Sequence, residues 1–355
     1  MKEYQLQIPD LSFQPTANDA LKKGALSRRR AIVLFGCAAG LPSIAVGNAF
    51  AAHEGISLYR WDGSALGAQA KLTLAHYDEK EAKNIISSAV QEIDRLENVF
   101  SLHRETSELS ILNGQGYISQ PSMDLAKLLK SAVNFGHDTS GAFDITVQPL
   151  WRVYATHFSN HSPQSSGPSQ KEIADALKTV DYRAVEISNR GIKLRLPEMA
   201  LTLNGIAQGY ITDKVTELLK TRGITQVLVE LGETRALDEH PEGRPWRIGL
   251  EDPENRNQST EVIELIDNAL ATSAGSGTKF SADGQLHHLF DPRTGLPSNH
   301  NLSASVITNS AATADALSTA LFVAEPEQAQ PIVEKVGGLT AIITGRDGKK
   351  RRLIS

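Results

Sequence analysis

The sequence predicts an α+β fold in which helices and strands are mixed without regular βαβ alternation. Residues 78–100 carry apolar side chains at helical spacing, whereas 225–231 form a β-branched run typical of a buried strand. The chain has 355 residues, of which 40% are hydrophobic and 22% charged, with a net charge of -5. This composition suits one large domain or two closely packed ones, and its mild acidity gives no electrostatic reason to expect nucleic-acid binding.

The first 51 residues have the features of an export signal, and 52–355 are expected to form the functional domain. Ser27-Arg28-Arg29-Arg30 is a basic start, 31–46 is apolar, and Ala49-Phe50-Ala51 offers small residues to a signal peptidase. Consecutive arginines before a weakly apolar stretch favour the twin-arginine route. We therefore expect a soluble periplasmic protein. The alternative is a basic start to an internal helix.

Cys37 is the only cysteine, so an intramolecular disulfide and a thiolate metal cage are excluded. Residues 34–37 also resemble a lipobox, in which Cys37 would carry lipid. Only about six apolar residues precede it, too few for a normal apolar region of a signal peptide. A lipoprotein is therefore the less favoured alternative, and any metal site is expected to use oxygen ligands.

Helices and strands follow in an irregular order along the rest of the chain. Ser122 can cap a helix through 135, Ser169-Gln-Lys-Glu172 is a capping box for a helix through 180, and Gly223 can end a helix that starts near Gln208. Two further helices are expected at 310–323 and 326–336, and the polar stretch 157–169 is expected to be a loop. Additional strands are expected at 70–76, 183–187, 192–196, 246–250, 261–265, 269–273, 302–308 and 339–344.

Two glycine-containing segments could contact a ligand. In 140–150, Gly141 and Ala142 would let a planar ring approach the backbone, Phe143 could stack on it, and Asp144 could accept hydrogen bonds from ring or ribose. Residues 203–210 place two glycines before a helix, as in a phosphate cradle. Each has an ordinary structural explanation: a turn followed by a short strand in the first, and a glycine-rich helix start in the second.

Two other segments carry groups suited to catalysis. The turn chemistry of Asp291-Pro-Arg-Thr-Gly295 does not explain the preceding His287-His288, which should face opposite sides of a strand. Histidine titrates near neutral pH and suits proton transfer from a hydroxyl. Asp315 and Thr319 lie four residues apart on one helix face and offer the hard oxygens that Mg²⁺ prefers. The alternative is that Thr319 bonds its own backbone.

Taken in order, these motifs resemble the FAD:protein FMN transferases, the ApbE-type flavin transferases. The family patterns G-A-F-D-x-T-V, D-L-G-G-I-A-K-G-Y, T-S-G, H-I-I-D-P-x-T-G and A-D-A-x-x-T-A correspond to 141–147, 202–210, 272–274, 288–295 and 314–320. Upstream, 100–104 and 107–113 resemble the S-E-L-S-x-L-N region. The resemblance covers about residue 66 to the C-terminus and implies T-fold-like mixed sheets with packed helices.

The resemblance implies that FAD is a substrate, that Mg²⁺ lies at its diphosphate, and that an acceptor threonine attacks the FMN phosphorus with release of AMP. His288 is then the candidate catalytic base. The metal ligands would be Asp315, Thr319 and a backbone carbonyl near Gly205. The residues expected to contact FAD are Leu66, Ser101, Leu102, His103, Ala142, Phe143, Asp144, Thr202, Gln208 and Leu289.

The sequence departs from the family pattern in the glycine motif. Thr202 and Gln208 stand where the family has Asp and Lys, Asn204 replaces its first Gly, and 231–235 replaces the commoner G-G-D. Loss of an acid and a base together keeps the local charge balanced. These departures, with the arginine-rich leader, are similar to the NosX-like branch, which is associated with flavinylating the membrane protein NosR for nitrous oxide reduction. An FAD-hydrolysing pyrophosphatase and a non-catalytic periplasmic flavin carrier or assembly factor are the alternative functions.

Overall fold

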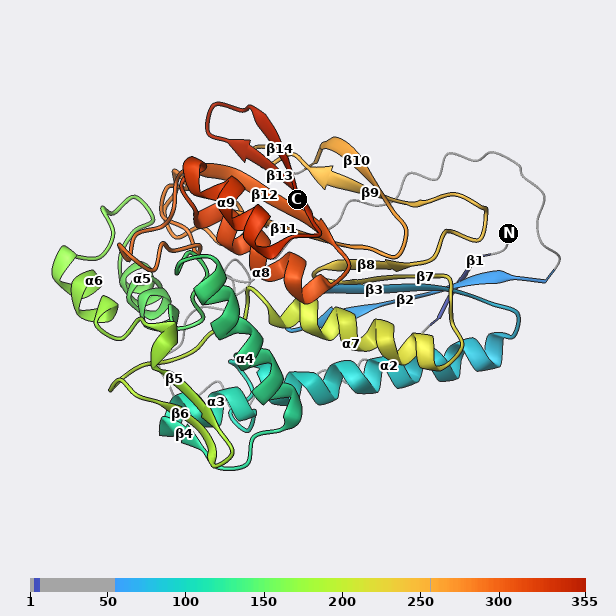
Figure 1. Cartoon of the computed structure of the whole chain (residues 1–355), viewed down its shortest axis with the longest axis horizontal. Helices are drawn as coiled ribbons and strands as arrows, with labels where there is room; N and C mark the ends of the chain where they lie inside the picture. Colours follow the sequence, from blue (N-terminus) through green and yellow to red (C-terminus); the bar gives the residue numbers. More distant parts are fainter. Residues whose placement is uncertain (1–2, 7–54, 256) are drawn as a thin grey trace.

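The computed structural model describes residues 3–6, 55–255 and 257–355, and its centre is one nine-stranded sheet (Figure 1). Strand β1 pairs parallel with β2, and all other neighbours in this sheet pair antiparallel. In spatial order the strands are β1 (Glu3–Gln5), β2 (Ser57–Ala65), β3 (Ala68–His76), β7 (Val227–Leu231), β8 (Thr234–Leu237), β11 (Ala269–Ala274), β12 (Asn301–Thr308), β13 (Thr340–Gly345) and β14 (Lys350–Ile354).

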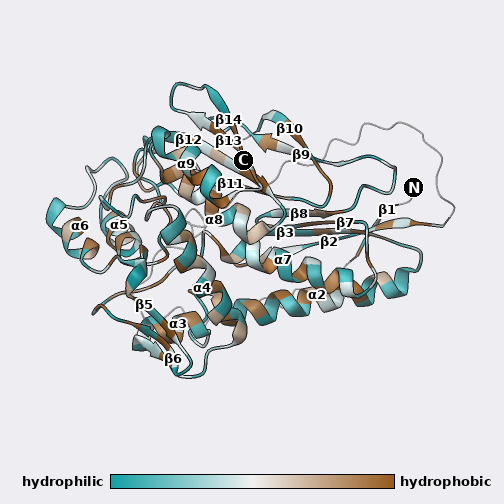
Figure 2. Cartoon of the chain, in the orientation of Figure 1, coloured by the Kyte–Doolittle hydropathy of each residue, from teal (hydrophilic) through white to brown (hydrophobic). Residues whose placement is uncertain are grey.

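The two faces of this sheet have different coverings (Figure 1). Helices α2 (Glu79–Phe100), α7 (Ala207–Thr221) and α8 (Ala311–Val323) pack on one face. The opposite face is covered in part by the antiparallel hairpin β9 (Trp246–Glu251) and β10 (Ser259–Leu265). The sheet is therefore apolar on both sides along much of its length, and this places many brown residues on its strands in Figure 2.

The remaining elements form a second group beside the sheet (Figure 1). Three short strands form a separate small sheet in the order β4-β6-β5. This group contains α3 (Glu108–Gln115), β4 (Tyr117–Ile118), α4 (Met123–Asp138), α5 (Gln148–Asn160), α6 (Gln170–Leu177), the 3₁₀ helix η3 (Tyr182–Ala184), β5 (Val185–Ser188) and β6 (Gly191–Leu194), and α9 (Pro326–Val336) lies against α4 and β14. None of the helices within the described residues is both long enough and apolar enough to cross a membrane.

The α+β prediction is confirmed, and the cap residues locate the helix starts as expected. The Asp78, Ser122 and Ser169 side chains each accept a hydrogen bond from the first turn of α2, α4 and α6. The capping box of Ser169 and Glu172 is present, although α6 ends at Leu177 and not at Val180. Helix caps are local, so sequence alone was sufficient to place them.

The alternative explanation of 140–150 as a turn followed by a short strand is wrong, as is the predicted start of the loop at His157. Helix α5 occupies Gln148–Asn160, with Pro149 in its first turn, where a missing N–H costs nothing. The helix buries Leu150 and Tyr154 in a small core with Phe280 and Phe290. These long-range contacts stabilise the helix and extend it past the polar residues that suggested a loop.

Strand β1 belongs to the predicted leader, of which residues 1–2 and 7–51 lie outside the described part of the chain. Glu3, Tyr4 and Gln5 lie opposite Leu58, Tyr59 and Arg60 in register. The Tyr4 ring stacks on Tyr59 with centroids 5.5 Å apart, and the following Leu6 is only 5% exposed. The first described residues are thus packed against the folded domain.

Candidate active site

Asp213 of α7 fixes the start of α8. Its carboxylate accepts hydrogen bonds from Ser310 Oγ at 2.8 Å and from the backbone N–H groups of Ala311 at 2.9 Å and Ala312 at 3.1 Å. Arg235 pairs with the same carboxylate. A carboxylate at a helix N-terminus satisfies unpaired N–H groups and interacts favourably with the helix dipole. The two helices are thus held together at the residues that precede Asp315.

Gly209 allows α7 and α8 to approach each other at the same junction. A Cβ atom at this position would lie 2.3 Å from the carbonyl oxygen of Ala311, too close for any other residue without movement of the backbone. The Gly209 N–H donates to the Asp315 carboxylate at 3.1 Å. The first turn of α7 therefore sets the orientation of the Asp315 side chain.

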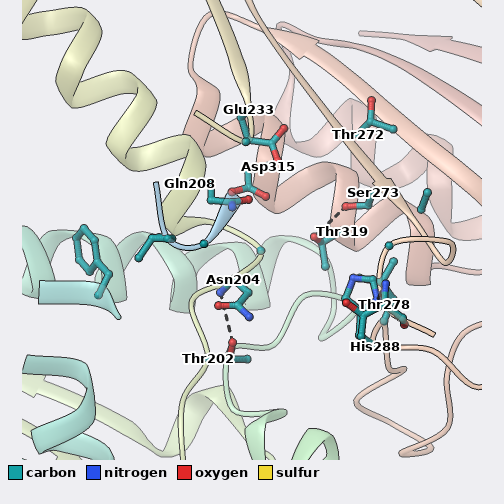
Figure 3. A pocket seen from close by; sticks show the side chains of 18 of the residues that line it. Thr202, Asn204, Gln208, Glu233, Thr272, Ser273, Thr278, His288, Asp315 and Thr319 are labelled. Carbon is teal, nitrogen blue, oxygen red and sulfur yellow. Dashed lines mark hydrogen bonds between the residues drawn. The ribbon is translucent and has the colours of Figure 1, made fainter. Parts of the chain in front are cut away.

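A second carboxylate, that of Glu233, lies beside Asp315 in the turn between β7 and β8 (Figure 3). Burial raises the pKa of Asp315 to about 8. Burial also raises the pKa of Glu233 well above its usual value, and the negative charge of Asp315 raises it further. Neighbouring carboxylates in a desolvated site disfavour ionisation unless a cation compensates them. The pair is therefore suited to binding a cation.

Two hydroxyl groups complete this oxygen cluster (Figure 3). Thr319 lies one turn after Asp315, and its Oγ1 is 3.2 Å from Ser273 Oγ on β11. Gly205 is adjacent, because a Cβ built on it would lie 3.0 Å from Thr319 Oγ1. In the described residues no three His, Cys, Asp or Glu side chains are grouped to hold a metal. Two carboxylates with neutral oxygens fit Mg²⁺, which takes its other ligands from substrate phosphate, backbone and water.

His288 lines the same cavity, but not from a strand as expected. The segment forms only isolated bridges, in which Lys279 pairs with His287 and Phe290 with Pro297. The His288 Nδ1 atom lies 3.2 Å from the carbonyl oxygen and 3.3 Å from the nitrogen of Thr278. Burial lowers the pKa of His288 to about 4, so that it is neutral at pH 7. With Nδ1 held by the backbone, Nε2 is the nitrogen available to a substrate.

The prediction that the neighbouring histidine faces away is confirmed. His287 is fully buried beside Phe322, with ring centroids 5.6 Å apart, and it does not line the cavity. Its Nδ1 accepts a hydrogen bond from the N–H of Leu289 at 3.2 Å. Burial and the adjacent His288 lower the pKa of His287 to about 3. His287 thus supports the loop that presents His288 and Leu289.

The loops that carry Leu66 and 101–103 are joined by Glu97. The Leu66 N–H, in a residue with φ of 47°, donates to Glu97 Oε1 at 2.6 Å. Arg104 pairs with the same carboxylate and with Asp94. Ser101 Oγ accepts from the backbone N–H groups of His103 at 3.1 Å and Arg104 at 3.2 Å. The two segments expected to contact FAD therefore lie at one end of the cavity in a defined relation to each other.

Residues 142–144 form part of the cavity wall, and their polar groups are already bonded within the protein. Phe143 is 3% exposed and meets Phe135 edge-to-face at 6.2 Å. Asp144 accepts from the Thr146 N–H at 2.7 Å and hydroxyl at 2.6 Å, and from the Tyr182 N–H at 3.1 Å. Burial raises the pKa of Asp144 to about 6. Its carboxylate thus holds the turn in place, so stacking and hydrogen bonding to a ligand by these two side chains stay predictions.

The glycine motif borders the cavity from below the carboxylate pair (Figure 3). Thr202 Oγ1 accepts a hydrogen bond from the Asn204 N–H at 3.3 Å. Gln208 packs on Gly232, where an added Cβ would lie 2.6 Å from Gln208 Cδ. The amide that replaces the family's lysine therefore contacts the turn that carries Glu233.

All the residues predicted for the site line one cavity of about 1240 Å³. Four further lining residues were not predicted from the sequence: Glu97, Glu233, Ser273 and Thr278. Glu233 had a signal in the sequence, because it stands in the segment that replaces the family's G-G-D. Ser273 was in a matched motif without an assigned role. Glu97 and Thr278 act through contacts with other lining residues, and no sequence motif indicates such contacts.

The chain is similar to proteins named FAD:protein FMN transferase. The FAD:protein FMN transferase of Escherichia coli (strain K12) is 28% identical over 296 residues, which is 80% of this chain and 83% of that protein. The Vibrio cholerae (strain O395) protein of the same name is 33% identical over 254 residues, 68% of this chain and 75% of that protein.

Solved structures show the same fold. The flavin transferase ApbE from Vibrio cholerae superposes with a TM-score of 0.72 and 27% identity over 84% of this chain and 97% of that one. The ApbE protein of Thermotoga maritima gives a TM-score of 0.73 and 28% identity over 83% and 97%. The ApbE-type fold expected from the resemblance is therefore confirmed. A family model described as the ApbE family matches residues 66–343, and the chain belongs to this family.

Proposed function

We propose that this protein is an FAD:protein FMN transferase that moves FMN from FAD to a threonine hydroxyl of an acceptor flavoprotein and releases AMP. The observation that carries the proposal is the single cavity that joins an oxygen cluster (Asp315, Glu233, Thr319 and Ser273) to His288. The residues expected to contact FAD line the same cavity. The name of the Escherichia coli relative supports the same activity.

The oxygen cluster would hold Mg²⁺ through Asp315, with Thr319, the backbone near Gly205 and Glu233 close by. When bound, the metal would neutralise the negative charge of the FAD diphosphate and so favour attack on phosphorus. The protein's own part is to fix the Asp315 carboxylate through Gly209 and Asp213 before substrate arrives. Phosphoryl transfer depends mainly on such positioning and charge neutralisation.

His288 would remove the proton of the acceptor hydroxyl. The threonine Oγ forms a bond to the FMN phosphorus, the P–O bond of the diphosphate breaks, and AMP leaves with the bridging oxygen. The proton passes to His288 Nε2, which the backbone of Thr278 orients through Nδ1. Because His288 is neutral at pH 7, it can accept this proton.

Incubation with FAD, Mg²⁺ and a candidate acceptor, analysed by mass spectrometry, tests the proposal. A covalent FMN adduct on the acceptor supports a transferase. Free FMN and AMP without an adduct would indicate a pyrophosphatase, because water would have replaced the threonine. Intact FAD would indicate a carrier, a function that the loss of the family's Asp and Lys at Thr202 and Gln208 favours.

We further propose that the acceptor is a NosR-like protein and that the transferase is a periplasmic member of the NosX-like branch. Supporting features are Thr202, Asn204, Gln208 and Glu233 in place of the common motif residues, and the arginine-rich leader. Transfer of FMN to the purified extracytoplasmic domain of a NosR-like protein would support this assignment. Transfer only to other flavoproteins would contradict the branch but not the activity.

A further inference from the structure

Part of the cavity is not accounted for by the residues expected to contact FAD. Its volume, about 1240 Å³, exceeds the range of about 300–1,000 Å³ typical of a pocket for one small molecule. The additional lining comes from the sheet face opposite α7 and from β9. We call this region the outer arm; its floor is Lys71, Glu230, Thr234 and Leu270, and its wall is 248–253.

The floor of the outer arm is a row of residues that runs across four neighbouring strands. Lys71 of β3 lies opposite Glu230 of β7, Glu230 opposite Thr234 of β8, and Thr234 opposite Leu270 of β11. Directly opposed residues share a face of the sheet. The adjacent positions Ala70 and Leu231 are fully buried in the core that the helices cover. The row thus lies on the face away from the helices, where three of its four residues are only half-buried.

The middle of the row lies next to the turn that carries Glu233. Glu230 and Thr234 flank the tight turn that carries Glu233, and the backbone of this turn is closed by a hydrogen bond from Leu231 N to Glu233 O at 2.9 Å. A ligand along the floor would therefore approach the turn of Glu233 from the sheet side, whereas Gln208 contacts this turn at Gly232.

The wall of the outer arm is an edge strand. Within the described chain β9 pairs only with β10, so alternate backbone N–H and C=O groups on its other side have no strand partner. At its centre is Gly249, where an added Cβ would meet only Ser259 of β10. A strand edge that has no strand partner among the described residues, and no bulk at its centre, is suited to an extended polypeptide.

We propose that the outer arm binds the acceptor protein's threonine-bearing segment in an extended conformation alongside β9. The inference rests on the proposed transferase function, since only a reaction with a second polypeptide needs this space. In this arrangement FAD and the acceptor segment reach the reacting phosphorus from different sides of the cavity. FAD lies among 66, 101–103, 142–144, 202, 208 and 289, and the acceptor hydroxyl enters from the sheet side.

Two substitutions that fill the floor test the proposal, Lys71→Trp and Thr234→Trp, with Thr260→Trp as the matched control. Thr260 is exposed on β10 and does not line the cavity. The acceptor probe is the purified extracytoplasmic domain of a NosR-like protein. We expect the KM for this domain to rise about tenfold or more in both floor variants, equivalent to about 1.4 kcal/mol of binding. FAD affinity, measured by flavin fluorescence, should change by less than about twofold, and the control should match wild type.

The possible outcomes distinguish failure of the proposed transferase function from failure of the proposed acceptor site. No transfer by the wild-type protein overturns the proposed function with this acceptor, and the docking inference falls with it. Wild-type transfer with an unchanged KM in both folded floor variants overturns the docking inference alone. A parallel loss of FAD affinity would also overturn it, because FAD would then occupy the outer arm. Circular dichroism of each variant establishes that it is folded.

Discussion

Asp315 and Thr319 occupy successive turns of α8 and differ in what their loss would remove. Asp315 is 3% exposed, and its carboxylate lies beside that of Glu233. Thr319 offers a neutral hydroxyl that already interacts with Ser273. A charged ligand anchors a cation, whereas one neutral ligand can be replaced by water.

Asp315→Ala should reduce AMP release from FAD by about 100- to 1,000-fold, corresponding to several kcal/mol of charge stabilisation. Additional Mg²⁺ should not restore the rate. Thr319→Val should require more Mg²⁺ but approach the wild-type rate at saturation. A magnesium titration of each variant measures both effects. If Asp315→Ala kept wild-type activity throughout the titration, the metal site would have to lie elsewhere.

His288→Asn should lower FMN transfer by about 10²–10⁴-fold, the usual contribution of a positioned base. FAD affinity should be nearly unchanged. In wild type, the base must be neutral, so kcat/KM should rise with pH around the lowered pKa of about 4 and be level at neutrality. This rising limb should disappear in the variant. A transfer loss explained entirely by weaker FAD binding would count against His288 as the base.

His287→Asn is the control for His288→Asn, although it is expected to lower the stability of the protein. His287 is fully buried, so its replacement should destabilise the protein by about 1–3 kcal/mol while leaving the pH limb in place. Denaturant unfolding distinguishes this effect from catalysis. Equal kinetic effects of the two substitutions, with stability unchanged, would contradict the separate roles assigned to them.

At the level of residues, sequence was most informative where the ligands are close together in the chain. Asp315 and Thr319 follow from a four-residue helical spacing, and both line the same cavity. Glu233 lies 82 positions before Asp315, so it is the tertiary fold that brings the two carboxylates together. Asp144 was expected from the sequence to bind a ligand, but its partners are backbone and hydroxyl groups of the protein.

At the level of elements, the junction of α7 and α8 connects the fold to the site. Gly209 contacts the backbone of Ala311, and Asp213 caps α8 a turn later. Backbone atoms cannot rotate away as side chains can, so even a methyl group here would have to move a helix.

Gly209→Ala should therefore destabilise the protein by about 1–3 kcal/mol, the usual cost of overpacking. It should also slow AMP release, because the N–H that orients Asp315 would shift. Gly114→Ala in α3 is the matched control: no atom lies within 4 Å of the added Cβ. There, the gain in helix propensity should stabilise the protein by roughly 0.5–1 kcal/mol. Urea unfolding of both variants gives the comparison, and equal stabilities would refute the close-packing argument.

The elements themselves were predictable where local signals were strong. Capped amphipathic helices and β-branched strands such as β7 were located to within a few residues. Strand β14 was missed because its sequence, Lys-Arg-Arg-Leu-Ile, is basic, as suits an edge strand. Strand β8 has only four residues and no alternating pattern. Strand β2 contains Asp62 and Gly63, which are depleted in strands, and its pairing with β3 compensates for them.

At the level of the whole molecule, the proposed export signal makes a prediction that is independent of catalysis. Arg28 and Arg29 changed together to Lys should leave the precursor in the cytoplasm, since the twin-arginine route reads this pair. Cell fractionation measures the result, and the unaltered protein is the control. Normal periplasmic accumulation of the double variant would exclude this route, and a lipid-bearing N-terminus at Cys37 would exclude the soluble form.

Cleavage of the leader would also remove strand β1, and this loss should affect self-association of the protein. Removal of the leader near Ala51 would take away the strand that covers β2, together with the ion pair of Glu3 with Arg60 and the stacked Tyr4. The backbone groups of Leu58, Tyr59 and Arg60 would then become part of the open border of this nine-residue strand. Such borders pair readily with another copy of the same chain. The precursor should consequently stay monomeric at concentrations where the processed protein begins to dimerise through β2.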